Sequence, residues 1–467
     1  MNKKILKFVI VLCLFSFLYS SCDFLYNSPN TLEYVHINPS KNEKKEDERL
    51  WTILIYMAAD NDLEYSAIED IYEMECSKLD TDKVSVFFLL DRSEVYDTSN
   101  DNWSGTRLYQ LQTGRHSYEK EIISKELFCP VLGLKKGANI DLDMSSPYVL
   151  TNALSYINDF YPAPNLGLIM WGHGTGWRAE RDKVDEAMGY KGFAHDNSSG
   201  CYMTLQQFCN GIKMGLNGKK LNLLGLDTCF GGEIEVMYEL KDSTEYAVGT
   251  EGLLFMSGWN YKRIFDSFEI EEKKTPENFV KNVVHQFSEE YSQSLCSSIV
   301  GIKMSFLNDY FRAFDTVMKI TAEKIETRKD RDEIANIIFS NGNSTTLAYS
   351  YGGKNSDVYL DINSIFNNLA SLYSYDDEIT KSIENFDSIK NKCIIADWAS
   401  NNESGGLGVY YGTLTAGNLI SSIHPDCYIK GKTSNQIQFV IDSLGYVPNI
   451  NNKNSFLDKL FYTSFKQ

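Results

Sequence analysis

The chain has 467 residues, of which 43% are hydrophobic and 13% are aromatic, and its formal net charge is −18. This length leaves room for a large core and two domains, and the apolar content excludes an intrinsically disordered chain. The acidic balance argues against a nucleic-acid partner, because phosphate binding needs clustered lysine and arginine. It favours a basic peptide as partner only weakly, since net charge chiefly affects solubility.

The first 22 residues have the layout of an export signal. Three lysines among the first seven residues precede an apolar stretch at residues 8–18, which is too short to span a membrane comfortably. Cys22 follows two serines, which resembles a bacterial lipobox, although Tyr19 stands where a leucine-like residue is usual. We expect a signal peptide at residues 1–22 and lipidation of Cys22, on the bacterial cell surface or in the periplasm. Ordinary secretion and an uncleaved anchor are the alternatives.

A flexible tether is predicted at residues 23–50. This stretch is rich in polar and charged residues, contains two prolines and has no sustained periodicity. We expect ordered structure to begin at Trp51. No later apolar run in the sequence is long enough to predict a membrane-spanning helix.

Between residues 51 and 264, short apolar runs alternate with helical patterns. The runs predict strands at residues 51–57, 84–90, 106–111, 166–171, 221–226 and 245–250. The intervening patterns predict helices at residues 62–78, 147–160, 205–214 and 232–240. Continuous apolar strands joined by helices indicate an α/β fold with a largely parallel sheet covered on both faces.

The pattern changes after residue 264 and predicts a second α/β domain at residues 265–467. Long helices are expected at residues 276–291 and 308–325, and strands at residues 298–306, 393–398 and 406–411.

Two of the predicted strands end in small-residue turns that carry reactive side chains. His173 follows the strand at 166–171 and Cys229 follows the strand at 221–226. Side chains at the carboxyl ends of neighbouring strands converge on one crevice of an open α/β sheet. A cysteine placed there before a helix would have a lowered pKa, with His173 as general base and then acid. Backbone N–H groups of Gly174 and Cys229 could stabilise the oxyanion of an attacked carbonyl.

Each of these two residues has a simpler explanation when it is considered alone. A cysteine at the end of an apolar strand is more often a small buried hydrophobe, and a His-Gly pair is common in turns. Their occurrence on two strands of one α/β pattern favours a catalytic dyad. Zinc hydrolysis, a serine nucleophile elbow and a phosphate-binding loop lack their motifs. Seven cysteines besides Cys229 lie beyond the signal segment, and their odd number and wide spacing do not indicate a disulfide framework.

At these residues the sequence resembles the clostripain family of cysteine peptidases. The similar stretches are WTILIYMAADNDLE at 51–64, YPAP at 161–164, HGTGW at 173–177, DTC at 227–229, GWNY at 258–261 and, more weakly, GGLGVYY at 405–411. The resemblance implies a caspase-like αβα sandwich with a mostly parallel central sheet. It also implies a His173 and Cys229 dyad, Gly174 as oxyanion donor, and cleavage after arginine or lysine.

The resemblance further implies residues that receive the basic side chain of a substrate. Asp227 matches an acidic position of the substrate pocket, where a carboxylate would pair with a guanidinium or ammonium group. Its alternative role is a turn or helix-capping aspartate. Ala59 and Asp60 match positions in the substrate cleft, although Asp60 could instead cap the first helix. The residues after Glu251 are apolar where further acidic character is expected, so either the pocket is less acidic than in relatives or Glu251 serves as the second carboxylate.

Members of the family are typically zymogens that cut themselves between the histidine and the cysteine. Residues 178–191 are polar, lack strand character and read as an exposed loop, the preferred place for nicking. The candidate cleavage sites there follow Arg178, Arg181, Lys183 and Lys191. A solvated loop that is never cut is the alternative.

Together these patterns predict an exported cysteine endopeptidase that cuts proteins after basic residues and is monomeric after processing. A catalytically inactive surface-anchored binding protein on the same scaffold is the rival hypothesis. Protein or peptide substrates are the expected partners, without nucleic acid, and contact with a membrane is expected only through the lipid anchor. The chemistry requires no cofactor or metal. Calcium is an activator in the family, but Asp141 and Asp143 form no recognised calcium loop.

Overall fold

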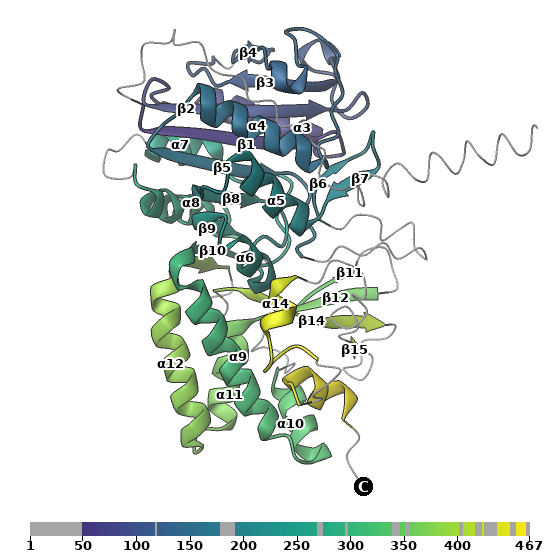
Figure 1. The fold of residues 1–467 in the computed structure, drawn as a ribbon, viewed down its shortest axis with the longest axis vertical. Helices are drawn as coiled ribbons and strands as arrows, with labels where there is room; N and C mark the ends of the chain where they lie inside the picture. The colour runs from purple at the N-terminus through teal and green to yellow at the C-terminus, as the bar shows by residue number, and fades with distance from the viewer. Residues whose placement is uncertain are drawn as a thin grey trace, which may run out of the picture. The chain divides into compact units, whose positions relative to one another are not determined.

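The computed structural model describes most of the chain from Arg49 onward (Figure 1). The described residues are 49–116, 119–177, 192–268, 274–294, 298–338, 346–350, 355–400, 405–415, 423–424, 437–448 and 454–463. The predicted signal segment, the predicted tether up to residue 48 and the predicted loop at 178–191 lie outside them. Within the described ranges, no helix combines the length and apolarity needed to cross a bilayer.

A nine-stranded sheet forms the centre of the fold. Its order is β13 (Ile394–Ala399), β10 (Ser298–Lys303), β9 (Thr244–Gly249), β8 (Leu221–Asp227), β5 (Asn165–Trp171), β1 (Trp51–Ala59), β2 (Val84–Arg92), β3 (Gly105–Gln110) and β4 (Lys125–Leu127). The five strands from β9 to β2 are parallel, and the outer pairs on each side run antiparallel. This parallel centre explains why the sequence shows unbroken apolar runs, since its strands are buried on both faces.

Two hydrophobic cores lie on opposite faces of this sheet. Alternate residues of β1 enter different cores, with Leu54 and Tyr56 on one side and Ile53 and Ile55 on the other. The first core is covered by α4 (Pro147–Phe160), α5 (Leu205–Gly215) and α6 (Ile234–Leu240). The second is covered by α3 (Glu64–Glu75), α7 (Tyr261–Phe268) and α8 (Pro276–Glu290). The result is a three-layered αβα arrangement.

A second, antiparallel sheet lies in the C-terminal part of the chain. It contains β11 (Thr346–Ser350), β12 (Asn355–Asp361), β14 (Gly408–Thr415) and β15 (Ile423–His424). The helices of this part are α9 (Leu307–Glu323), α10 (Arg328–Ile338), α11 (Ile362–Leu372), α12 (Asp377–Cys393) and the short α14 (Gln438–Asp442). Their buried side chains continue the first core, and Gly408 N–H donates to the Gly232 carbonyl at 3.0 Å. The C-terminal elements therefore pack directly behind the turn that follows β8.

The strands and helices predicted before residue 264 are present, with ends shifted by at most three residues. The central sheet itself continues past the predicted domain boundary at residue 264, because β10 and β13 extend it beyond β9. That boundary stays a prediction. A small hairpin of β6 (Phe193–Asp196) and β7 (Cys201–Met203) follows the segment at 178–191 and lies against β1 and β5.

Candidate active site

The turns that carry His173 and Cys229 leave the same edge of the central sheet. Strands β5 and β8 are parallel neighbours, and Trp171 is in register with Asp227. Gly172 N–H extends this pairing by donating to the Asp227 carbonyl at 3.3 Å. The two strands thus stay in register up to their last residues, and the two turns begin from there.

The two turns are in close contact at Gly174. A Cβ atom on Gly174 would lie 2.6 Å from the Cys229 carbonyl oxygen and 2.8 Å from the Thr228 Cβ. No side chain fits in that space, so glycine is required for the approach. The contact holds the backbone next to His173 against the backbone of Cys229. The Gly174 N–H is part of this contacting backbone.

The Cys229 thiol is partly buried beneath the loop that follows β9. Its Sγ accepts a hydrogen bond from Leu254 N–H at 3.2 Å. Burial raises the pKa of the thiol, the Leu254 hydrogen bond opposes this, and the Asp227 carboxylate adds to it. The expectation of a lowered pKa was therefore wrong, and α6, which follows the cysteine, begins only at Ile234.

The backbone turns sharply right after the cysteine. Phe230 has a φ of 57°, a left-handed conformation that is rare for an aromatic residue. Its N–H donates to the Gly252 carbonyl at 2.8 Å, and its ring lies 5.0 Å from that of Tyr359. Packing against the C-terminal sheet therefore holds a strained residue next to Cys229.

His173 is held from its other side by an aspartate. Its Nε2 lies 2.7 Å from Asp62 Oδ1, and the two side chains are 39% and 63% exposed. A second imidazole, that of His195 on β6, has its ring centre 6.3 Å from that of His173. Burial lowers the pKa of His195 to about 4, with the charge of His173 adding to the effect. His195 is therefore neutral at physiological pH.

Asp227 is a buried carboxylate at the end of β8. It is 3% exposed, and its Oδ2 accepts a hydrogen bond from the Tyr261 hydroxyl at 2.8 Å. Its Oδ1 has no hydrogen-bond partner among the described residues. A Cβ on Gly258 would lie 3.2 Å from both carboxylate oxygens, so a glycine borders the carboxylate.

Other buried acids surround Asp227. Burial raises the pKa of Asp227 to about 7, and the nearby Glu73 contributes. Asp70, which accepts from the Trp171 indole at 2.7 Å, also has a raised pKa because of burial and of Asp227 itself. The helix-capping alternative does not match the geometry, because the N-cap residue of α6 is Glu233. Ionised, these carboxylates would attract a cationic group.

Comparison with known proteins assigns the family. The sequence profile of the clostripain family matches residues 55–442. The chain belongs to the clostripain family of cysteine peptidases. Clostripain from Hathewaya histolytica is 27% identical over 248 residues, a match that covers 51% of this chain and 45% of clostripain. The chain thus spans less than half the length of that curated relative.

Solved structures of C11 proteases share the fold. A secreted C11 cysteine protease from Bacteroides thetaiotaomicron, in complex with an irreversible peptide inhibitor, superposes with a TM-score of 0.56 and 15% identity, covering 84% of this chain and 99% of that one. An inactive zymogen C11 protease from Parabacteroides distasonis gives a TM-score of 0.52 and 17% identity, covering 78% and 92%. The predicted caspase-like αβα sandwich with a mostly parallel sheet is confirmed.

The other candidate pocket residues of this clostripain-family chain lie in two places. Ala59 is the buried last residue of β1, and Asp60 accepts a hydrogen bond from Ser198 N–H at 2.8 Å. Asp60 does not cap α3, whose N-cap makes no side-chain hydrogen bond. Glu251 is buried beside Asp361, and burial and the Asp361 carboxylate raise its pKa.

The remaining sequence-predicted positions are outside the described residues. These are Cys22 and the basic residues Arg178, Arg181, Lys183 and Lys191. The residues that bracket the 178–191 segment are nevertheless paired with each other. Thr175 N–H donates to the Gly192 carbonyl at 3.0 Å, and Gly192 N–H donates to the Thr175 hydroxyl at 2.6 Å. The described residues on the two sides of the segment are therefore paired at Thr175, which is two residues from His173.

Sequence reasoning missed Asp62 and His195 as neighbours of His173. Asp62 could have been suspected, because β1 and β5 were predicted as parallel strands and the turn after β1 would then reach the same edge. His195 had no such signal, since it follows the segment at 178–191 on a strand of four residues.

We expect Asp62→Ala to lower kcat/KM by about two- to fivefold. An ion pair this exposed contributes up to about 1 kcal/mol, far less than a group that takes a proton in the reaction. The measurement is hydrolysis of a fluorogenic arginine peptide, with Asp242→Ala as control, since Asp242 is an exposed carboxylate paired with Lys220. A loss as large as that of His173→Ala would contradict this view of Asp62.

Proposed function

We propose that this chain is an exported cysteine endopeptidase that cleaves peptide bonds after arginine or lysine. The observation that carries the proposal is the Gly174 contact, which joins the His173 turn to the Cys229 turn at the carboxyl edge of β5 and β8. Membership of the clostripain family supports the reaction class. The buried carboxylate of Asp227 and the acids near it support the preference for a basic substrate side chain.

In the proposed reaction His173 takes the thiol proton as Cys229 Sγ attacks the scissile carbonyl carbon. The raised pKa of the thiol makes this base necessary, because little thiolate exists at neutral pH without it. The negative charge that develops on the carbonyl oxygen is stabilised by the N–H groups of Gly174 and Cys229. His173 then donates its proton to the leaving amine. Water, activated by His173, hydrolyses the thioester and regenerates the thiol without any cofactor.

Asp227 is proposed to bind the basic side chain of the substrate. Its carboxylate would accept from a guanidinium or ammonium group, while Oδ2 also accepts from the Tyr261 hydroxyl and the Trp259 backbone N–H helps to stabilise the charged form. A charge-assisted contact of this kind is stronger in a buried recess than at the surface. Glu251 was a second candidate from the sequence, but its neighbours support a structural role against the C-terminal sheet.

Export follows from the sequence signal, and one structural relative is described as secreted. We further propose that Cys22 is lipidated and that the mature protein is monomeric.

Cys229→Ala is expected to abolish hydrolysis, because no other group in the proposed mechanism forms the thioester. Cys201→Ala is the matched control, since Cys201 is a partly exposed cysteine on β7. His173→Ala should reduce the rate by about 10²–10⁴-fold through loss of the proton acceptor. Turnover of an arginine peptide by purified Cys229→Ala at the wild-type rate would refute the proposal.

Asp227→Asn is expected to weaken cleavage after arginine by about 1–3 kcal/mol of transition-state binding. The ratio of kcat/KM for an arginine substrate to that for a norleucine substrate should also rise with pH. The carboxyl is protonated below its raised pKa of about 7 and ionised above it, so basic substrates gain as the pH increases. Between pH 6 and 8 the ionised fraction grows about tenfold.

The ratio isolates Asp227 because kcat/KM reports ionisation of the dyad in the free enzyme, which is the same whichever substrate is added. Asp227→Asn should have a ratio independent of pH, whereas the control Glu73→Gln should keep the dependence. Equal losses on both substrates would mean that Asp227 supports the loop and does not bind the side chain.

Maturation by self-cleavage within residues 178–191 is proposed as the activation step. One structural relative is described as an inactive zymogen, and the Thr175–Gly192 pairing brings both ends of the segment beside His173. Wild-type protein should be cut after Arg178, Arg181, Lys183 or Lys191, and Cys229→Ala should stay intact by mass spectrometry. The two chains should remain together, since β5 and β8 pair in one sheet. Cutting of both proteins, or of neither while the wild type is active, would exclude self-activation.

A further inference from the structure

The loop after β9, residues 252–258, connects the surroundings of the nucleophile with those of the buried carboxylate. In its first half Leu254 N–H donates to Cys229 Sγ at 3.2 Å. At its end a Cβ on Gly258 would lie 3.2 Å from both carboxylate oxygens of Asp227. A substrate with its scissile carbonyl at Cys229 and its basic side chain at Asp227 would therefore lie along this loop.

The middle of the loop exposes three large apolar side chains, which we call the apolar cluster. Leu253 is 44% exposed, Phe255 is 48% exposed and Met256 is 59% exposed. Within the described ranges, no other stretch of four residues exposes three large apolar side chains. Single exposed apolar residues are common on protein surfaces, but a group of them is typical of a binding surface. Because the cluster adjoins the nucleophile, the ligand that it fits is an apolar part of the substrate.

The loop is held in place from two sides. The side chain of Leu254, between two exposed neighbours, packs against the second core. The Phe255 ring stacks on that of Tyr291, with ring centres 5.2 Å apart and an angle of 17° between them. The Tyr291 hydroxyl donates to the Gly258 carbonyl at 2.7 Å, and Gly258 N–H donates to the Phe255 carbonyl at 2.9 Å. The backbone that presents the cluster therefore needs little ordering when a ligand binds.

The order of the strands assigns the cluster to one side of the scissile bond. Strands β5, β8 and β9 are parallel, with β8 between the other two. The turn with His173 follows β5 and the loop at 252–258 follows β9, so the two leave the sheet on opposite sides of Cys229. In the proposed reaction His173 donates its proton to the leaving amine, so the residues after the cut depart on the β5 side. The residues before the cut then lie on the β9 side, where the cluster is.

We propose that Leu253, Phe255 and Met256 bind an apolar side chain of the substrate, that of the residue directly before the basic residue. Successive side chains of an extended peptide point in opposite directions. Asp227 is buried, whereas the cluster lies on the exposed side of the loop that borders it. A peptide that directs its basic side chain inward to Asp227 therefore directs the preceding side chain outward.

The chemistry of the loop sets the class of side chain that fits. Residues 252–258 have the sequence GLLFMSG and contain no charged side chain. An aliphatic or aromatic residue at this substrate position would cover the apolar cluster and gain the free energy of removing apolar surface from water. A charged residue would lose hydration without gaining a partner from this loop. The inference rests on the proposed function for the position of the peptide and adds to it a second element of selectivity.

The test compares two fluorogenic amides, acetyl-Leu-Arg and acetyl-Gly-Arg, as substrates of the wild-type protein. We expect kcat/KM to be about tenfold higher for the leucine substrate, at the low end of the effect of an apolar contact in an enclosed pocket, because the cluster is an open surface. Leu253→Ser, Phe255→Ser and Met256→Ser should each lower this ratio by about threefold, since each removes part of the apolar surface. Met256→Leu should retain the ratio, because it keeps an apolar side chain.

The matched control is Tyr375→Ser, which removes an exposed aromatic side chain between α11 and α12. This variant should keep the wild-type ratio. Melting temperatures check that the variants fold. If Phe255→Ser does not fold because it loses the Tyr291 contact, Met256→Ser, the variant at the most exposed of the three positions, decides the test. An unchanged ratio in folded Met256→Ser and Leu253→Ser would overturn the proposal.

A second pair of peptides tests the side of the scissile bond. Acetyl-Gly-Arg-Leu and acetyl-Gly-Arg-Gly amides, cut after arginine, should be cleaved at similar rates. A gain from leucine after the cut that equals the gain from leucine before it would overturn the assignment to the β9 side.

Binding of the product acids separates this inference from the proposed function. Calorimetric titration of wild-type protein should show tighter binding of acetyl-Leu-Arg than of acetyl-Gly-Arg. Cleavage of both amides at equal rates would overturn the inference and leave the peptidase in place. Absence of cleavage with tighter binding of the leucine acid would refute the peptidase and leave the apolar site in place. Absence of a leucine preference in both measurements would overturn the inference whatever the activity.

Discussion

The contact of Gly174 with the Cys229 backbone is the constraint on which the active site depends. It places the histidine turn and the cysteine turn relative to each other through backbone atoms, after the β5–β8 register has aligned the two strand ends. The reactive side chains take little part in holding this geometry. Removal of the thiol or the imidazole should therefore leave the fold intact, and losses of activity in such variants can be read as chemistry.

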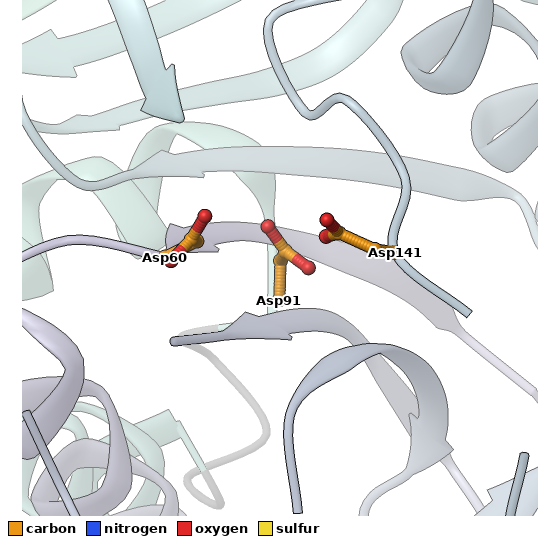
Figure 2. Close-up of side chains that lie close together, drawn as sticks. All are labelled: Asp60, Asp91 and Asp141. Carbon is orange, nitrogen blue, oxygen red and sulfur yellow. The ribbon is translucent and has the colours of Figure 1, made fainter. Parts of the chain in front are cut away.

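The end of β2 shows two ways of burying charge in one protein. Successive strand residues face opposite sides of the sheet. Arg92 is neutralised internally, with its Nε 2.7 Å from Glu64 and a second nitrogen 3.1 Å from Asp97. Asp91, on the opposite face, accepts a hydrogen bond from the Thr106 hydroxyl and lies close to the Asp60 and Asp141 carboxylates (Figure 2). The charge of Arg92 is balanced by acids, whereas burial and the neighbouring carboxylates raise the pKa of Asp91 well above its usual range and so favour its neutral form.

The sequence predicted those features that are encoded locally. Strands β1, β2, β5 and β8 were recognisable because burial on both faces requires unbroken apolar runs. Partnerships between distant residues were not predictable. Asp227 is held by Tyr261, 34 residues later, and the central sheet gains β10 and β13 by antiparallel pairing that no local pattern specifies. The thiol pKa was wrongly predicted because burial of Cys229 and the charge of Asp227 raise it, and neither effect is visible in the local sequence pattern.

The electrostatics of the resting site bear on how the proposed enzyme selects its substrates. The Asp227 carboxylate raises the pKa of the Cys229 thiol, so its negative charge opposes formation of the thiolate. If an arginine or lysine side chain binds at Asp227 as proposed, its positive charge would cancel that of the carboxylate at a site where burial keeps screening weak. The thiol would then be easier for His173 to deprotonate than in the presence of a neutral substrate. Under the proposed function, the carboxylate that binds the side chain would also favour the reactive form of the nucleophile, so selectivity would arise in the chemical step as well as in binding.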